Sequence, residues 1–164
     1  MIYLIQSSFI IYLGYVIISI IKTKSSLENL SDTYYIWPKW VFPTFMTVIA
    51  SILLPAWLEI TEGHDLQFLA FLSCAGLIFV GFTPNYRNDK MQYKIHSICV
   101  YLIALTSVLS MLYLIGGIEH FIISLIVIFL TAWALGENFK ECWLFKLETA
   151  LFLGNYFSLI NQVN

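Results

Sequence analysis

The chain has 164 residues, of which 60% are hydrophobic and only 11% are charged. A soluble domain of this length carries about a quarter of its residues as charged side chains. The composition therefore excludes an ordinary water-covered surface and indicates a protein that is solvated by lipid. The net charge of -2 offers no basis for binding nucleic acid.

The first predicted membrane helix covers residues 2–21, enough to cross a hydrocarbon core of about 30 Å. The N-terminus lacks the basic region and the small-residue cleavage site of a signal peptide, so we expect this helix to be retained. Its polar side chains recur at helical spacing on one face, which we expect to turn toward other helices. They are Ser8, Tyr12, Tyr15 and Ser19.

A polar connection, residues 22–39, leads to a second apolar segment over residues 40–58. Pro43 and Pro55 lie near its two ends, where we expect kinks because proline frees a backbone carbonyl. This segment also has a polar stripe at helical spacing, formed by Thr44, Thr47 and Ser51.

Four more apolar segments follow, each separated from the next by a polar or glycine-containing turn. They cover residues 66–82, 93–114, 121–135 and 142–160. We find no repeat and no separate soluble region. The prediction is an all-α fold: one polytopic bundle of six transmembrane helices that spans residues 1–164.

The positive charges give an independent prediction of orientation. All of them fall in or beside the first, third and fifth loops: Lys22, Lys24, Lys39, Arg87, Lys90, Lys94, Lys140 and Lys146. With six spans these loops share one side, and the positive-inside rule makes that side cytoplasmic. We therefore expect a multi-pass protein of the cytoplasmic or inner membrane with both termini extracytoplasmic.

Ionisable groups at membrane depth are costly, which makes each of them a candidate functional residue. His96 lies one turn inside the fourth segment and Glu148 about two turns inside the sixth. Asp32, preceded by Ser31, lies in the first cytoplasmic loop. These four residues are the candidate catalytic set, with His96 as base or proton relay and Asp32 or Glu148 to orient it. For a buried Glu148 we expect His96 to be the partner. The alternatives are hydrogen bonds that only join helices, or a metal site, for which one histidine is a thin ligand set.

Two further patterns concern the sixth segment and the opposite face of the membrane. Glu141, Glu148 and Asn155 are spaced by seven residues, so they share a helical face that we expect to look into the bundle. The extracytoplasmic loops form an acidic cluster that we interpret as a solvated rim, with a divalent-cation site as the alternative. It consists of Glu59, Glu62, His64, Asp65, Glu119 and His120.

No motif identifies a cofactor. The chain has no glycine-rich phosphate loop, no metal-binding histidine pair at helical spacing and no cysteine pair. Its cysteines are three in number and lie far apart in or beside apolar segments, so we interpret them as small buried residues. They are Cys74, Cys99 and Cys142.

Three short stretches, together with the six-helix layout, resemble the Frag/DRAM/Sfk-type membrane proteins and the related bacterial family. The stretches are Leu30-Ser31-Asp32, Gly81-Phe82-Thr83-Pro84 and His96, which match an Ile-Ser-Asp/Glu motif and a Gly-x-Phe-Pro…His motif. This chain departs from the pattern at Thr83 and in the long basic loop before His96. The resemblance implies six helices and a link to membrane lipids, without an established chemistry.

Three functional hypotheses follow. The first is a lipid-handling or lipid-modifying protein with a polar pocket in the cytoplasmic half of the bundle, lined by Ser31, Asp32, His96 and Glu148. The second is a small channel or pore, with the polar stripes of the first, second and sixth segments along its path. The third is a scaffold or accessory subunit. Membrane lipids are the expected partners, and a homo-oligomer or a partner protein in the membrane is left open.

Overall fold

The computed structural model describes residues 1–23, 27–65, 67–113, 117–134 and 143–163. Throughout these residues the fold is helical, and each of the six predicted segments forms an α-helix. The helices are α1 Ile2–Thr23, α2 Val41–Ile60, α3 Phe68–Phe82, α4 Lys90–Tyr113, α5 Gly117–Ala134 and α6 Trp143–Val163.

Helix α4 begins three residues before its predicted start because Asp89 caps it. The Asp89 carboxylate accepts hydrogen bonds from the backbone N–H groups of Met91 (2.8 Å) and Gln92 (3.1 Å). Such a cap satisfies donors that have no partner inside the helix. The same hydrogen bonds lower the pKa of Asp89 and keep the cap ionised.

A short 3₁₀ helix, η1 (Leu30–Tyr35), interrupts the polar connection between α1 and α2 and is absent from the predicted elements. Its signal is a capping box. The Asn29 side chain accepts from the Asp32 backbone N–H, and the Asp32 side chain accepts from the Asn29 backbone N–H. Reciprocal capping of this kind starts a helix without an apolar periodicity.

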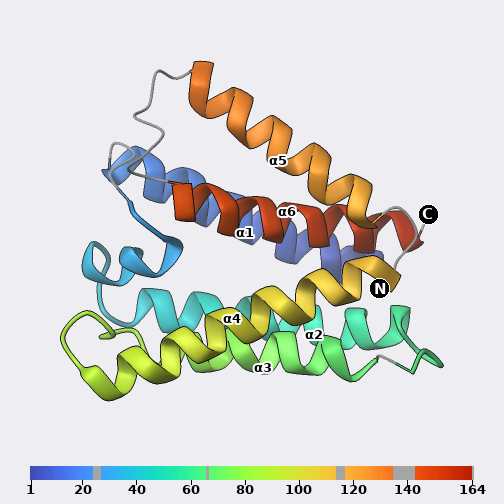
Figure 1. Ribbon diagram of the computed structural model, residues 1–164, viewed down its shortest axis with the longest axis horizontal. Coiled ribbons are helices and arrows are strands. Elements are labelled where there is room, and N and C mark those ends of the chain that lie inside the picture. The colour runs from blue at the N-terminus through green and yellow to red at the C-terminus, as the bar shows by residue number, and fades with distance from the viewer. Residues whose placement is uncertain (24–26, 66, 114–116, 135–142, 164) are drawn as a thin grey trace.

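The helices form a ring with one helix outside it (Figure 1). Helix α3 packs against α2 and α4, while α1 contacts α2 and α6, and α4 closes the ring on α6. Helix α5 lies outside and packs mainly on α6. The two chain termini lie at one end of the bundle, and η1 lies at the other end beside the turn that joins α3 to α4.

The polar stripe predicted on α1 does face the other helices. Ser8, Tyr12 and Ser19 are fully buried. The Ser8 and Tyr156 hydroxyls lie 2.7 Å apart, and the Trp37 indole N–H donates to the Ser19 hydroxyl at 3.2 Å. These contacts connect α1 to α6 and to the segment after η1.

The stripe predicted on α2 has the opposite orientation, because Thr44 and Ser51 are exposed. Apolar side chains of α2, among them Phe45, Met46 and Ile49, occupy the inner face instead. Burying these larger apolar groups leaves the small hydroxyls on the outside of the ring. The interpretation of this stripe as part of an inner path is therefore wrong for a single subunit.

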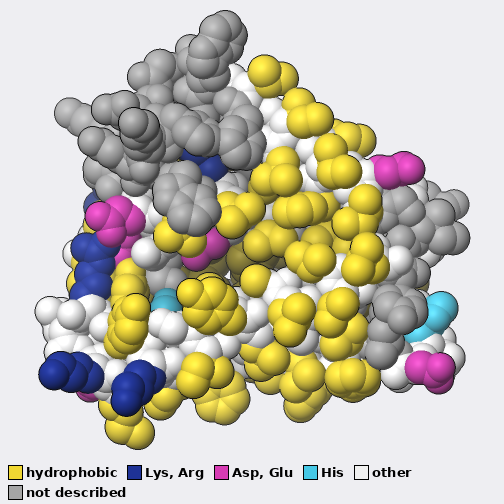
Figure 2. Space-filling model, in the orientation of Figure 1, with side chains coloured by type: hydrophobic (Ala, Val, Ile, Leu, Met, Phe, Trp, Pro, Cys, Tyr) yellow, Lys and Arg dark blue, Asp and Glu magenta, His cyan; other side chains and the backbone are white. Residues whose placement is uncertain are grey.

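Three helices among the described residues are long and apolar enough to cross a membrane, namely α1, α2 and Lys90–Leu112 of α4. Helices α3 and part of α5 are also apolar but shorter. Large apolar side chains cover the outside, with Ile10, Phe79 and Tyr101 all more than half exposed. Figure 2 shows this apolar surface between a basic end, at η1, and an end with acidic and histidine side chains.

Candidate functional site

Asp32 is buried at the basic end of the bundle and joins η1 to the turn between α3 and α4. Its Oδ2 accepts a hydrogen bond from the Arg87 guanidinium at 2.7 Å, and its Oδ1 accepts one from the Tyr86 hydroxyl at 2.5 Å. The Asp32 side chain is 8% exposed, whereas Arg87 is 45% exposed. Arg87 also pairs with the exposed Glu28 at 2.9 Å.

Tyr86 connects Asp32 to His96. The Tyr86 and His96 rings are stacked, with centroids 4.3 Å apart and an interplanar angle of 17°. Burial, together with the hydrogen bond to Asp32, raises the pKa of the Tyr86 hydroxyl, so this group remains a donor. The structure therefore brings Asp32 and His96 into one cluster through a residue that the sequence interpretation passed over.

His96 is buried, and its own hydrogen bond assigns its tautomer. Nδ1 lies 3.0 Å from the Thr83 carbonyl oxygen. A carbonyl only accepts, so Nδ1 carries the hydrogen and Nε2 has the lone pair. Among the described residues Nε2 makes no hydrogen bond. The bond to Thr83 fastens the start of α4 to the end of α3 and leaves one basic nitrogen uncommitted.

We expect His96→Asn to separate the structural role of this side chain from a chemical one. The asparagine Nδ2 can replace the Nδ1–H donor to Thr83, so the free energy of unfolding should fall by no more than about 1 kcal/mol. His96→Leu removes the donor and should cost about 1–3 kcal/mol. Unfolding in detergent measures both. Equal losses for the two variants would show that the Thr83 hydrogen bond is not what His96 contributes.

Glu148 is held by η1 instead of by His96, which was its expected partner. Its Oε2 accepts a hydrogen bond from the Leu30 backbone N–H at 2.7 Å. A second contact joins α6 to this segment, since the Phe145 backbone N–H donates to the Glu28 carbonyl at 3.0 Å. The two bonds dock η1 onto the start of α6 and place Ser31 next to Glu148.

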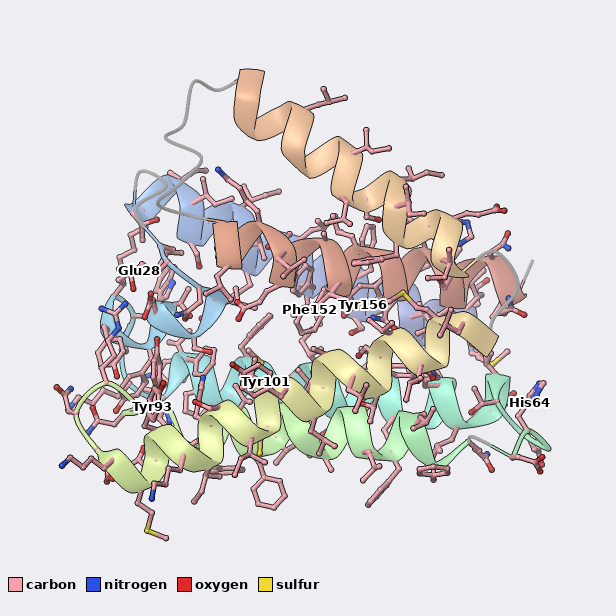
Figure 3. The ribbon with its side chains drawn as sticks, viewed as in Figure 1. Glu28, His64, Tyr93, Tyr101, Phe152 and Tyr156 are labelled. Atoms are coloured by element: carbon pink, nitrogen blue, oxygen red, sulfur yellow. The ribbon has the colours of Figure 1, made fainter. Side chains whose placement is uncertain are left out.

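A cavity of about 80 Å³ lies inside the ring. Its walls come from α2, α3, α4 and α6, and η1 borders it through Leu30 and Ser31. One water molecule needs about 10–15 Å³ by the same measure, so the cavity has room for several waters or for a short segment of a hydrocarbon chain. Its walls are mostly apolar, and Ser31 and Glu148 are among its polar members. Figure 2 shows the surface hollowed between α4 and α6, and in Figure 3 Phe152 and Tyr156 project from α6 toward α2 and α4.

The four predicted site residues therefore divide into two groups. Ser31 and Glu148 line the cavity, whereas Asp32 and His96 are outside its lining and belong to the cluster around Tyr86. The prediction that Glu148 and Asn155 share an inward face is confirmed, because both line the cavity. Glu141, the third residue of that stripe, is outside the described residues.

The sequence interpretation missed Tyr86 and the pairing role of Arg87. Arg87 was interpreted only as an orientation signal, yet it forms ion pairs with Asp32 and Glu28. A basic and an aromatic residue at adjacent positions in a turn were the available signal. It could not be matched to Asp32 without knowing that the two loops lie at the same end of the bundle.

No three histidine, cysteine or acidic side chains among the described residues are placed to hold a metal ion. Cys74 and Cys99 are buried and free, as expected for small core residues, and Cys142 lies outside the described residues. Figure 3 shows His64 at the end of the bundle opposite Glu28 and Tyr93.

Comparison with protein-family models, with curated proteins and with solved structures finds no match. The resemblance to the Frag/DRAM/Sfk-type proteins accordingly stays a prediction. The cavity and the cluster of Asp32, Tyr86 and His96 are the two features of the structure that bear on function.

Proposed function

We propose that this protein is a six-span membrane protein that binds the hydrocarbon part of a lipid in the cavity between α4 and α6. This topology is supported by the directions of the six helices, which run alternately up and down the bundle. The two termini lie at one end and the basic side chains gather at the other. In it both termini are extracytoplasmic, and η1 and the Tyr86 turn face the cytoplasm. The membrane proposed is the cytoplasmic or inner membrane.

The cavity is the observation that carries the proposal. Its apolar lining includes Leu53, Leu77 and Ile103, from three different helices, and suits a hydrocarbon chain. The hollow lies on a face covered with exposed apolar side chains, so a lipid can reach it from the bilayer without crossing water. Segment η1 closes the basic end of the cavity through Leu30 and Ser31.

Ala104→Phe tests lipid binding directly. Ala104 lines the cavity, and a phenyl ring there should occupy the space that the lipid needs. After extraction in mild detergent, we expect the variant to carry about one tenth or less of the lipid that the wild type carries. Native mass spectrometry measures the bound lipid. Ser107→Leu, a smaller filling change in the same wall, should produce a partial loss.

Leu105→Phe is the matched control, because Leu105 is the next residue of α4 and is 60% exposed. It adds an aromatic ring to the outer face and should leave lipid retention unchanged. Thermal unfolding of all the variants separates lipid loss from misfolding. Equal lipid retention in folded Ala104→Phe, Leu105→Phe and wild-type protein would remove the proposal and favour a scaffold.

Lipid modification is a separate hypothesis, because His96 is not part of the cavity lining and would have to meet the lipid outside it. A base at His96 uses its Nε2 atom, so folded His96→Asn should lose the lipid change that expression of the wild type causes in a lipidomic profile, since an amide is not a base at neutral pH. An unchanged lipid profile in the folded variant would leave binding without chemistry.

A further inference from the structure

One carboxylate oxygen in the cavity wall has no partner among the described residues. Glu148 lines the cavity from α6, and its Oε2 atom is committed to the Leu30 backbone N–H at 2.7 Å. Its other oxygen, Oε1, makes no hydrogen bond to the part of the chain that the structure describes. Nor is Oε1 one of the buried side-chain atoms that the fold closes off from solvent. The Leu30 bond therefore fixes the carboxyl group and leaves one acceptor open to a ligand.

The other polar groups of the wall are less suited to a ligand. The Ser73 and Tyr156 hydroxyls already bond other hydroxyls, each at 2.7 Å, and the Asn155 amide oxygen is closed off by the fold. No lysine, arginine or histidine is among the lining residues that the structure describes. The charge of a Glu148 carboxylate therefore has no counter-ion in the wall of the cavity.

Glu148 lies at the end of the cavity that faces the cytoplasm in the proposed topology. It docks on η1, and Ser31 borders the cavity beside it. The lining continues along α6 to Leu159, about 16 Å further toward the other end of the bundle. Phe152 projects from the helix between these two residues (Figure 3). A lipid of the cytoplasmic leaflet has the same orientation, with its polar group near the membrane surface and its chain directed to the bilayer centre.

The unpaired carboxylate limits the class of polar group that binds there. A phosphate or carboxylate group is repelled by Glu148 and finds no cation in the described lining. A hydroxyl group donates a hydrogen bond but leaves the buried charge uncompensated. A protonated primary amine supplies three donors and the opposite charge, and charge-assisted hydrogen bonds are about twice as strong as neutral ones. The chemistry of the wall therefore favours an alkylammonium group.

We propose that Glu148 binds the protonated primary amine of an amphiphile whose hydrocarbon chain lies in the cavity. The amine donates to Oε1, while Oε2 keeps its hydrogen bond to Leu30. This inference rests on the proposed lipid-binding function and specifies the polar group of the ligand. A free aliphatic amine and the amine headgroup of a phospholipid share this chemistry, and the experiment distinguishes the two.

Glu148→Gln tests the amine site. Glutamine has the size of glutamate and keeps an acceptor for the Leu30 N–H, but it carries no charge. On the purified full chain in a nonionic detergent, we expect the variant to bind dodecylamine about tenfold more weakly than the wild type does. Its affinity for dodecan-1-ol should stay within about twofold of the wild-type value. Titration with native mass spectrometry measures both, and the partition of each probe into micelles cancels in the ratio of the two proteins.

Glu28→Gln is the matched control, because it removes the same charge at the same end of the bundle. The Glu28 side chain is 71% exposed and is outside the cavity lining. This variant should bind dodecylamine as the wild type does. An equal loss for Glu28→Gln and Glu148→Gln would overturn the site, since it would show that the amine responds only to the net charge of that end.

Two further probes identify which amine binds. Dodecyltrimethylammonium has the charge without an N–H donor, and the wild type should bind it about tenfold more weakly than dodecylamine. Lauroyl-lysophosphatidylethanolamine carries a primary amine together with a phosphate. If Glu148→Gln weakens binding of this lysolipid as well as of dodecylamine, the site takes an amine headgroup. Weakened binding of dodecylamine alone identifies a free aliphatic amine, and either result supports the site.

The outcomes distinguish the amine site from the cavity itself. If folded Glu148→Gln binds dodecylamine as tightly as the wild type, while Ala104→Phe abolishes binding of every probe, the amine site is wrong and the lipid-binding proposal stands. If no probe binds to the wild type, both proposals fail. If Glu148→Gln does not fold, dodecylamine and dodecyltrimethylammonium on the wild type decide, and equal affinities overturn the site.

Discussion

Asp32→Ala should lower the free energy of unfolding by about 2–4 kcal/mol. The change removes one carboxylate that serves Arg87, Tyr86 and the capping box of η1 at the same time. Because the side chain is 8% exposed, water replaces these hydrogen bonds poorly. Denaturant unfolding of the protein in detergent measures the loss.

Glu28→Ala is the matched control for this prediction. Glu28 pairs with the same guanidinium as Asp32, but its side chain is 71% exposed. Exposed ion pairs contribute only about 0–1 kcal/mol. A loss of stability for Glu28→Ala as large as that for Asp32→Ala would mean that burial is not what gives the Asp32 cluster its strength.

The loss of the Asp32 cluster should also reach the cavity. Without it η1 keeps its bond to α6 and the hydrogen bond from the Arg87 backbone N–H to Tyr35, but it loses the two bonds that Asp32 makes with the turn between α3 and α4. We expect Asp32→Ala protein to retain less lipid in proportion to its loss of stability, whereas Ala104→Phe loses lipid at nearly constant stability. This difference separates a positioning residue from a lining residue.

Gly81→Leu should destabilise the protein by about 3 kcal/mol through overpacking. Gly81 lies near the end of α3, where a Cβ atom would come within 2.9 Å of the Met46 Cβ and 3.4 Å of the Pro43 carbonyl oxygen on α2. Neither contact is the flexible end of a side chain, so the two helices have to separate. Thr83, which anchors His96, is two residues away.

Gly14→Leu is the corresponding control on α1. A Cβ atom at Gly14 meets nothing within 4 Å. Leucine is also the better helix former, by up to about 1 kcal/mol. This variant should therefore be neutral or slightly more stable in thermal unfolding. Similar destabilisation of both variants would indicate that helix flexibility, not close packing of α3 on α2, determines the effect at Gly81.

The six helices could be predicted from the sequence because each is a long apolar segment bounded by polar or glycine-containing turns. The inward face of α6 could be predicted as well, from the spacing of Glu148 and Asn155. The stripe on α2 could not, because hydroxyl groups at helical spacing do not reveal which side of a helix buries more apolar area. Segment η1 was missed because a capping box makes a short helix without hydrophobic periodicity.

The sequence identified the residues of the candidate site better than it identified their partners. Asp32, His96 and Glu148 stand out as ionisable groups beside apolar segments. Their partners are a backbone N–H, a backbone carbonyl and a tyrosine that are distant in sequence from them, such as Tyr86 for Asp32. Backbone groups carry no signal in the composition of a loop, so the sequence could not show that Glu148 meets the Leu30 backbone N–H instead of His96.

The sequence by itself determined that this is an all-helical protein suited to lipid, with its basic residues in alternate loops, because composition and periodicity depend only on the order of the residues. Only the tertiary structure decided that Asp32 meets Arg87, that Glu148 meets the Leu30 backbone N–H, and that four helices and η1 surround a cavity. These features arise where side chains from different helices approach one another. The distances between these side chains depend on how the helices pack into a ring. No single segment of the sequence determines that packing.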